Sequence, residues 1–129
     1  MKKLCYQTLK DINYDGYLLH EAPERVLQFG EGNFLRAFVD YFIDVLNEKT
    51  GFNSKVVLCQ PIAPGLADMI NEQEGLYTLY LRGFQNGQKV NRKRIISCVS
   101  RCLNPYIEFD ELLACAENSD LRYIACNTT

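Results

Sequence analysis

Residues 25–38 read RVLQFGEGNFLRAF. The apolar run at 25–29 is short and closes at Gly30, which is typical of a strand buried on both faces of a sheet. From Asn33 onward, apolar residues recur at the spacing of a helix. The stretch therefore predicts a strand, a turn containing two glycines and a helix in direct succession.

Further elements extend this unit along the chain. The helix is predicted to run over 33–49, with its apolar residues facing the core, Asp40 and Asp44 on the opposite polar side, and Gly51 as its cap. Residues 55–60 form a second buried strand that Pro61 ends, and 63–74 form a shorter helix. The order strand, helix, strand requires a right-handed crossover and parallel pairing.

The middle of the chain has a different pattern. Residues 76–84 and 89–103 are rich in Tyr, Thr, Val and Ile and flank Asn86 and Gly87, which favour a hairpin turn because both tolerate positive φ. A helix over 109–117 and a further buried strand over 121–126 follow. The predicted fold class is α/β, Rossmann-like, with a mostly parallel sheet and an antiparallel β-hairpin insertion.

The predicted organisation is a surface leader over 1–24 and one nucleotide-binding domain over 25–129. The sequence stops at the carboxyl edge of a core strand, where another crossover is expected, so we expect a truncated, incomplete domain. A length of 129 residues supports one core and excludes a second domain.

Composition narrows the classes of function. The chain is 47% hydrophobic and 23% charged, which predicts a folded globular protein. A net charge of −2 disfavours nucleic-acid binding, and no signal peptide or membrane-spanning run is present, so a cytoplasmic protein is expected. The six cysteines lack the spacing of a zinc site, and we expect buried, reduced thiols and no metal.

The two glycines suggest a phosphate-binding turn. Gly30 permits a tight bend, and Gly32 has no Cβ, so that a pyrophosphate could approach the backbone at the start of the helix. The third glycine of the dinucleotide-binding pattern is replaced by Leu35. The alternative is that both glycines only satisfy the geometry of the turn. Glu31 is interpreted as a structural residue of the turn.

The end of the second strand bears on the choice of cofactor. Nucleotide-binding folds usually place an acid there, whereas this chain has Gln60, which can hydrogen-bond a ribose without charge. No arginine adjoins Gln60 to bind a 2′-phosphate, which favours NAD over NADP. The missing acid also counts against a methyltransferase. Arg36 is interpreted as solvated or internally paired, and the basic residues at 89–94 are interpreted as a solvated face.

Residues 26–38, VLQFGEGNFLRAF, resemble the amino-terminal signature of the mannitol dehydrogenase family of polyol-specific long-chain dehydrogenases. The segments 57–62, 77–83, 99–101, 104–106 and 126–129 also resemble this family. The resemblance implies NAD-dependent interconversion of D-tagaturonate and D-altronate, with a small sugar acid as substrate. The alternatives are another polyol or hexuronate dehydrogenase, such as a fructuronate reductase or a mannitol dehydrogenase, and a non-catalytic nucleotide-binding or interaction domain.

The resemblance also implies roles for individual residues. The cofactor-binding turn would comprise Gly30, Gly32, Asn33 and Phe34, and Gln60 would lie on the adenosine side. Two further residues, Asn127 and Thr128, would lie near the cofactor at the mouth of the sheet. The family's catalytic lysine belongs to a carboxyl-terminal helical domain that these residues do not include, so no catalytic residue is assigned and this part alone is expected to be inactive.

Overall fold

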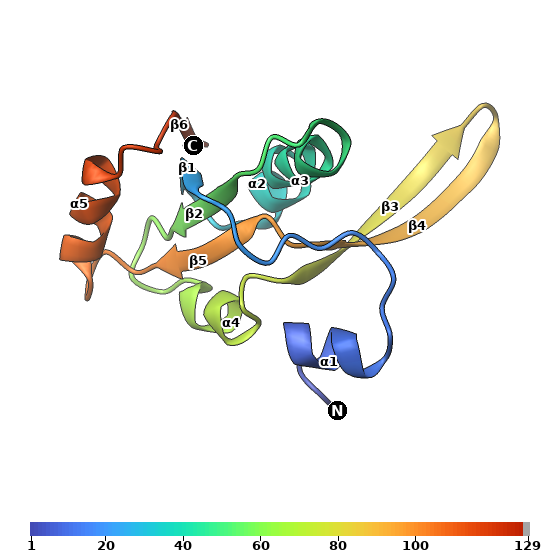
Figure 1. Cartoon of the computed structure of the whole chain (residues 1–129), viewed down its shortest axis with the longest axis horizontal. Coiled ribbons are helices and arrows are strands. Elements are labelled where there is room, and N and C mark those ends of the chain that lie inside the picture. Colours follow the sequence, from blue (N-terminus) through green and yellow to red (C-terminus); the bar gives the residue numbers. More distant parts are fainter. Residues whose placement is uncertain (128–129) are drawn as a thin grey trace.

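A computed structural model describes residues 1–127. Figure 1 shows the succession of helices and strands along the chain. In order they are α1 (Tyr6–Asp11), β1 (Glu24–Phe29), α2 (Asn33–Ala37), α3 (Val39–Thr50), β2 (Lys55–Cys59), α4 (Ala67–Glu72), β3 (Tyr77–Gln85), β4 (Gln88–Ile96), β5 (Val99–Leu103), α5 (Phe109–Glu117) and β6 (Tyr123–Cys126).

The centre of the molecule is a parallel sheet. Its four strands lie in the order β5-β2-β1-β6, and every neighbouring pair is parallel. Leu27 in β1 pairs with Val57 in β2, and Gln28 pairs with Leu58. The predicted α/β, Rossmann-like fold is confirmed, because helical crossovers connect parallel strands of one sheet.

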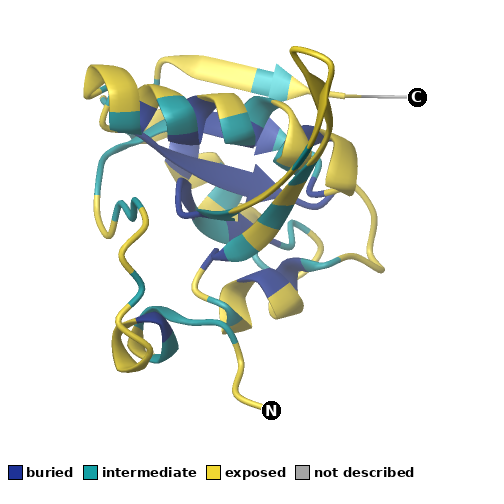
Figure 2. Ribbon diagram, turned by 90° about the vertical axis from the view of Figure 1, so that its right-hand side faces the viewer, coloured by how far each residue is buried: buried dark blue, intermediate teal, exposed yellow. Residues whose placement is uncertain are grey.

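Helices cover both faces of this sheet. On one face, the core includes Val56 and Leu58 of β2, Ile43 of α3 and Ile70 of α4. On the other face, Leu27 and Val57 pack with Cys115 of α5. All residues of β2 are buried, as predicted for a central strand, and Figure 2 shows the buried strands between more exposed helices.

The predicted helix over 33–49 is wrong in two respects. It is broken at Phe38, whose φ of −116° and ψ of −75° separate α2 from α3. Its polar side is also not the exposed one, because Asp40, Asp44 and Asn47 are buried together with Ile43. Four apolar side chains are exposed instead, and we call them the aromatic face: Phe34, Phe38, Phe42 and Leu46. Gly51 caps α3 in the left-handed conformation, as predicted.

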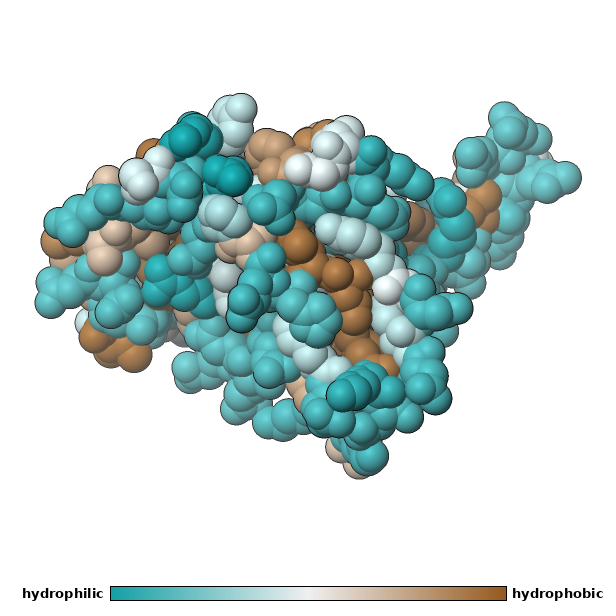
Figure 3. Space-filling view, in the orientation of Figure 1, coloured by the Kyte–Doolittle hydropathy of each residue, from teal (hydrophilic) through white to brown (hydrophobic). Residues whose placement is uncertain are grey.

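The hairpin forms a separate sheet. Within residues 1–127, strands β3 and β4 pair only with each other, and Figure 1 shows them extending away from the parallel sheet. Asn86 and Gly87 have φ values of 53° and 77°, which confirms the predicted turn. The second arm was predicted to continue to 103, but it ends at Ile96, and Val99–Leu103 pairs with β2 as β5. The end of the hairpin is mostly hydrophilic in Figure 3.

The two outer segments also differ from the sequence prediction. The leader contains α1, a short helix that buries Leu9. The sequence of this segment has no clear helical periodicity, so the helix was not predicted. The strand expected over 121–126 is exposed rather than buried, with Tyr123 60% and Ile124 65% exposed. It lies at the edge of the sheet, so it has only β1 as a neighbour within residues 1–127.

The cysteines are free, and those at 59, 98, 102 and 115 are buried as expected, whereas Cys5 is half-buried and Cys126 is exposed. Burial raises the pKa of the Cys102 thiol to about 12, so it is an unreactive core residue. Over residues 1–127 none of the helices has the length and hydropathy needed to cross a membrane.

Candidate functional site

The turn at residues 30–32, called the glycine turn below, lies at the carboxyl end of β1. Gly30 has a φ of +129°, and its N–H donates to the carbonyl of Cys59 at 2.9 Å, which ties the turn to β2. A Cβ on Gly30 would lie 2.8 Å from Cδ1 of Leu35. Leu35 is buried and packs directly on Gly30, so it provides the close helix packing that the missing third glycine would otherwise allow.

Gly32 is under no comparable constraint from the protein. Its φ of −71° and ψ of 171° suit any residue, and a Cβ placed on it would have no atom within 4 Å. The space above this backbone is therefore free for a ligand. Glu31, between the two glycines, is only 8% exposed, which agrees with its interpretation as a structural residue.

Asn33 and Phe34 begin α2 beside the glycine turn, and both are exposed. The side-chain oxygen of Asn33 accepts a hydrogen bond from Nη2 of Arg36 at 2.8 Å. Phe34 stacks on Phe38 with 5.5 Å between ring centroids. Since α2 is only five residues long, its dipole is smaller than that of the long helix predicted, and the turn's own backbone is the main polar surface offered to an anion.

Two buried polar side chains, Gln28 and Asp40, form a hydrogen-bonded pair beneath the glycine turn. Nε2 of Gln28 donates to the carbonyl of Gly30 at 3.0 Å and to Oδ2 of Asp40 at 3.1 Å. Burial raises the pKa of Asp40 to about 7. Sequence reasoning missed this pair, because Gln28 lies in an apolar strand and helical periodicity placed Asp40 on the polar side.

The Gln60 side chain is held by the loop that follows β2. Its amide nitrogen donates to the carbonyls of Ile62 and Ala63 at 3.0 and 2.9 Å, and its oxygen accepts from the N–H of Ala67 at 3.1 Å. At 2% exposure, the side chain is fully engaged inside the protein. Gln60 therefore shapes the loop after β2, and its contact with the adenosine side of the cofactor stays a prediction.

The remaining predicted site residues follow β6. Phe29 of β1 pairs with Cys126, so the exposed Asn127 lies at the same carboxyl edge of the sheet as the glycine turn. Thr128 lies outside the described residues. Of the predicted set, the structure brings Gly30, Gly32, Asn33, Phe34 and Asn127 to one edge, while Gln60 is sealed within the adjoining loop.

Two arginines, Arg36 and Arg94, make contacts within the protein. The Arg36 guanidinium lies 5.1 Å from the ring centroid of Tyr77, whose hydroxyl donates to the Arg36 carbonyl at 2.7 Å. Arg94, expected on a solvated face, instead forms ion pairs with the buried Asp44 at 2.8 Å and with Glu48 at 3.4 Å. These contacts fasten the base of the hairpin to α2 and α3.

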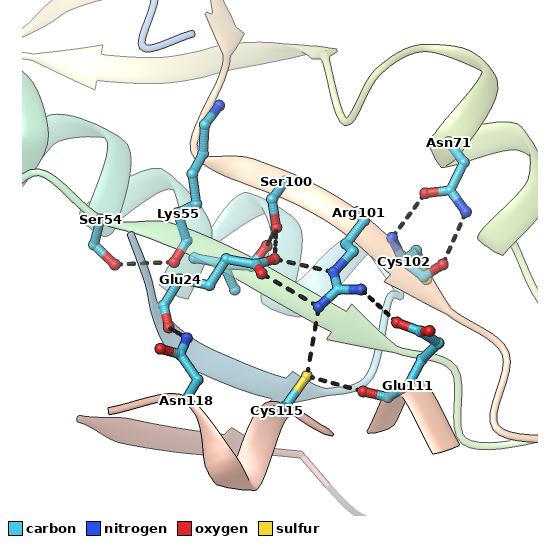
Figure 4. Close-up of polar contacts among 11 residues, drawn as sticks. Glu24, Ser54, Lys55, Asn71, Ser100, Arg101, Cys102, Glu111, Cys115 and Asn118 are labelled. Carbon is cyan, nitrogen blue, oxygen red and sulfur yellow. Dashed lines mark hydrogen bonds and ion pairs between the residues drawn. The ribbon is translucent and has the colours of Figure 1, made fainter. Parts of the chain in front are cut away.

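The opposite edge of the sheet, at the amino ends of the strands, is closed by polar contacts. A hollow of about 860 Å³ there is lined by Lys55, Ser100 and Arg101 among others. Figure 4 shows Arg101 between Glu24 and Glu111, with its Nε 3.1 Å from Glu24 and its Nη1 3.2 Å from Glu111. These side chains bind one another and thereby hold β1, β5 and α5 together at this edge.

Comparison with known proteins agrees with this geometry. The family model described as the mannitol dehydrogenase Rossmann domain matches residues 24–129. The chain belongs to the mannitol dehydrogenase family. In this family it is 49% identical to an altronate oxidoreductase of Phocaeicola vulgatus and 47% identical to one of Bacteroides thetaiotaomicron, each over 94% of this chain and 25% of the relative. The chain thus spans a quarter of the length of these relatives.

A solved structure supports the fold. The mannitol 2-dehydrogenase of Pseudomonas fluorescens, in a ternary complex with NAD and D-mannitol, superposes with a TM-score of 0.79 at 21% identity. The match covers 98% of this chain and 26% of that protein. At this identity the likeness shows the shared Rossmann fold of the mannitol dehydrogenase family and nothing finer.

Proposed function

We propose that this chain is the NAD-binding domain of an oxidoreductase that interconverts D-altronate and D-tagaturonate. The observation that carries the proposal is the open backbone at Gly32, where a Cβ would meet no protein atom within 4 Å although the residue lies in the turn between β1 and α2. A glycine that the fold itself does not require is expected where a ligand approaches the backbone closely. The altronate oxidoreductase relatives support the substrate class.

Each residue of the turn would have a separate task. Gly30 bends the chain at its φ of +129°, and Leu35 holds the bend in place. Gly32 would leave room for the pyrophosphate, which would face the backbone of the glycine turn. Asn33 and Phe34 would border the cofactor at the same edge, and Asn127 would approach it from the end of β6. Bound NAD would supply hydride transfer to or from the sugar-acid carbon.

The loop after β2 supports NAD over NADP. Gln60 fixes the loop through both ends of its amide, so the loop backbone and not this side chain would face the adenosine ribose. The residues that follow, 61–65, are Pro, Ile, Ala, Pro and Gly, which provide no cation for a 2′-phosphate.

Replacing Gly32 with Ala tests cofactor binding. Because the backbone conformation suits alanine and the Cβ meets no protein atom, we expect Gly32→Ala to unfold at the same temperature as the wild-type chain. The methyl group would occupy the pyrophosphate space, so affinity for NAD, measured by calorimetry, should fall by about tenfold or more. Gly83→Ala is the matched control, since a Cβ there also meets nothing and the site lies in the hairpin. Equal NAD affinity in both variants would contradict the proposal.

The substrate requires a second experiment, because the chain covers a quarter of its relatives. Residues 24–127 would replace the matching domain of the Bacteroides thetaiotaomicron altronate oxidoreductase, with which the chain shares 47% identity. We expect the chimera to oxidise altronate with NAD, followed by NADH absorbance, and Gly32→Ala in the chimera to raise the KM for NAD. A folded chimera that does not reduce NAD with altronate would contradict the proposal.

A further inference from the structure

In the buried pair of Gln28 and Asp40 beneath the glycine turn, the hydrogen-bond acceptors outnumber the donors. Gln28 of β1 and Asp40 of α3 are both 0% exposed. The Gln28 amide nitrogen uses both of its hydrogens, one toward Oδ2 of Asp40 and one toward the carbonyl of Gly30. Gln28 therefore links the buried carboxyl of Asp40 to the backbone of the turn.

Two oxygens of this pair have no donor. Oε1 of Gln28 and Oδ1 of Asp40 are buried and have no hydrogen-bond partner within residues 1–127. An ionised carboxylate can only accept hydrogen bonds, so it would leave both oxygens unsatisfied, which is costly in a protein interior. A protonated carboxyl has one donor, and a carboxylic acid and a primary amide can pair through two parallel hydrogen bonds.

We propose that Asp40 is protonated in the folded chain and pairs with Gln28 through two hydrogen bonds, which makes the two side chains positioning residues for the glycine turn. One bond is the observed contact from Nε2 of Gln28 to Oδ2 of Asp40. In the other, the Oδ1–H of Asp40 donates to Oε1 of Gln28. The second hydrogen of the amide is then held on the Gly30 carbonyl, which fixes the orientation of the turn.

The surroundings of Asp40 favour the neutral acid. Burial is the largest influence and raises the pKa of Asp40 to about 7, while the Gln28 hydrogen bond and the Arg36 charge lower it and Asp44 raises it. Tyr77 of β3 and Cys98 also face this carboxyl, and both are uncharged because burial raises the pKa of each. No ion pair joins Asp40 to a cation in the described part of the chain. No cation therefore competes with the proton for the Asp40 carboxyl.

The pair makes stability depend on pH in a defined direction. The folded pKa of about 7 lies above the ordinary value of 3.8, so between these values the folded chain holds a proton that the unfolded chain has released. Stability contributed by this proton is complete below about pH 4 and is lost as the pH rises through about 7. Asp40→Asn removes the titration but keeps both hydrogen bonds, because the asparagine amide donates to Oε1 of Gln28.

Urea unfolding across about pH 5–8 tests the pairing. The ratio of the unfolding constants of the wild type and Asp40→Asn should rise by up to about tenfold per pH unit below pH 7 and then level off. Asp68→Asn, an exposed acid on α4, is the matched control and should follow the wild type. Parallel pH profiles of the wild type and Asp40→Asn would overturn the proposal.

Carbon NMR of the wild-type carboxyl groups gives a reading that does not depend on any variant. We expect the Asp40 carboxyl to remain protonated near pH 6, and the amide signals of Gly30 and Gly32 to shift as it titrates. An Asp40 carboxyl that titrates near the ordinary value of 3.8 would overturn the proposal.

The effect on the cofactor rests on the proposed function. NAD affinity should fall above the pKa of Asp40 in the wild type and stay constant in Asp40→Asn. Should neither protein bind NAD at any pH, the proposed function fails, while the carboxyl titration still decides whether the acid and amide are paired.

Discussion

At the scale of single residues, the two glycines of the turn differ in what requires them. Gly30 has a φ of +129° and carries the Leu35 side chain against it, whereas Gly32 has an ordinary backbone and open space. We predict that Gly30→Ala lowers the free energy of unfolding by about 2 kcal/mol, because of backbone strain and the Leu35 clash. Chemical denaturation measures this, and a loss of equal size in Gly32→Ala would show that the distinction is wrong.

Residues that need only their own backbone conformation could be predicted from sequence, and those whose side chains bind other groups could not. Gly51 and the Asn86-Gly87 turn were identified because each needs only its own backbone conformation. Gln60 was assigned to the ribose because its position is informative, but its amide is used by three backbone groups of the following loop. Whether a polar side chain points outward or inward depends on such contacts, which spacing does not encode.

At the scale of elements, α3 is attached to the hairpin through its polar side. Asp44 is 0% exposed and binds Arg94 of β4 and the N–H of Ser97 at 2.9 Å. We predict that Arg94→Leu lowers the free energy of unfolding by about 3 kcal/mol, because a buried carboxylate loses its partner. Arg92→Leu, an exposed neighbour on the same strand, should change it by less than about 0.5 kcal/mol. Similar losses in urea unfolding of the two variants would contradict this.

These contacts explain why the sequence prediction placed the wrong side of α3 toward the core. The apolar spacing of Phe34, Phe38 and Phe42 continues without interruption across the break at Phe38, and neither Gly nor Pro marks it. The parallel pairing was predictable because crossovers between short apolar strands follow a general rule. The buried polar side of α3 depends on residues some 50 positions away, such as Arg94 with Asp44.

At the scale of the whole molecule, the aromatic face is an uncovered apolar surface. Phe34 is 62% exposed, and Phe38 and Phe42 are each 49% exposed. The Phe34 ring stacks on Phe38, and the Phe38 ring contacts Phe42 at a tilt. We predict that the isolated chain associates with increasing concentration, and that replacing these three residues with Gln reduces the association seen by sedimentation velocity. Phe84→Gln, which removes an exposed aromatic from the hairpin, is the control and should leave the association unchanged.

The segment before β1 closes the amino ends of the strands, where the Lys55 ammonium donates to the carbonyls of Leu19 and Ser97. Met1 is fully exposed, and α1 packs beside Lys55 through Tyr6. The glycine turn lies at the other end of the same strands. A tether placed ahead of Met1 would consequently hold the protein on a sensor surface with its ligand edge directed into solution, so immobilised binding measurements can be made without blocking that edge.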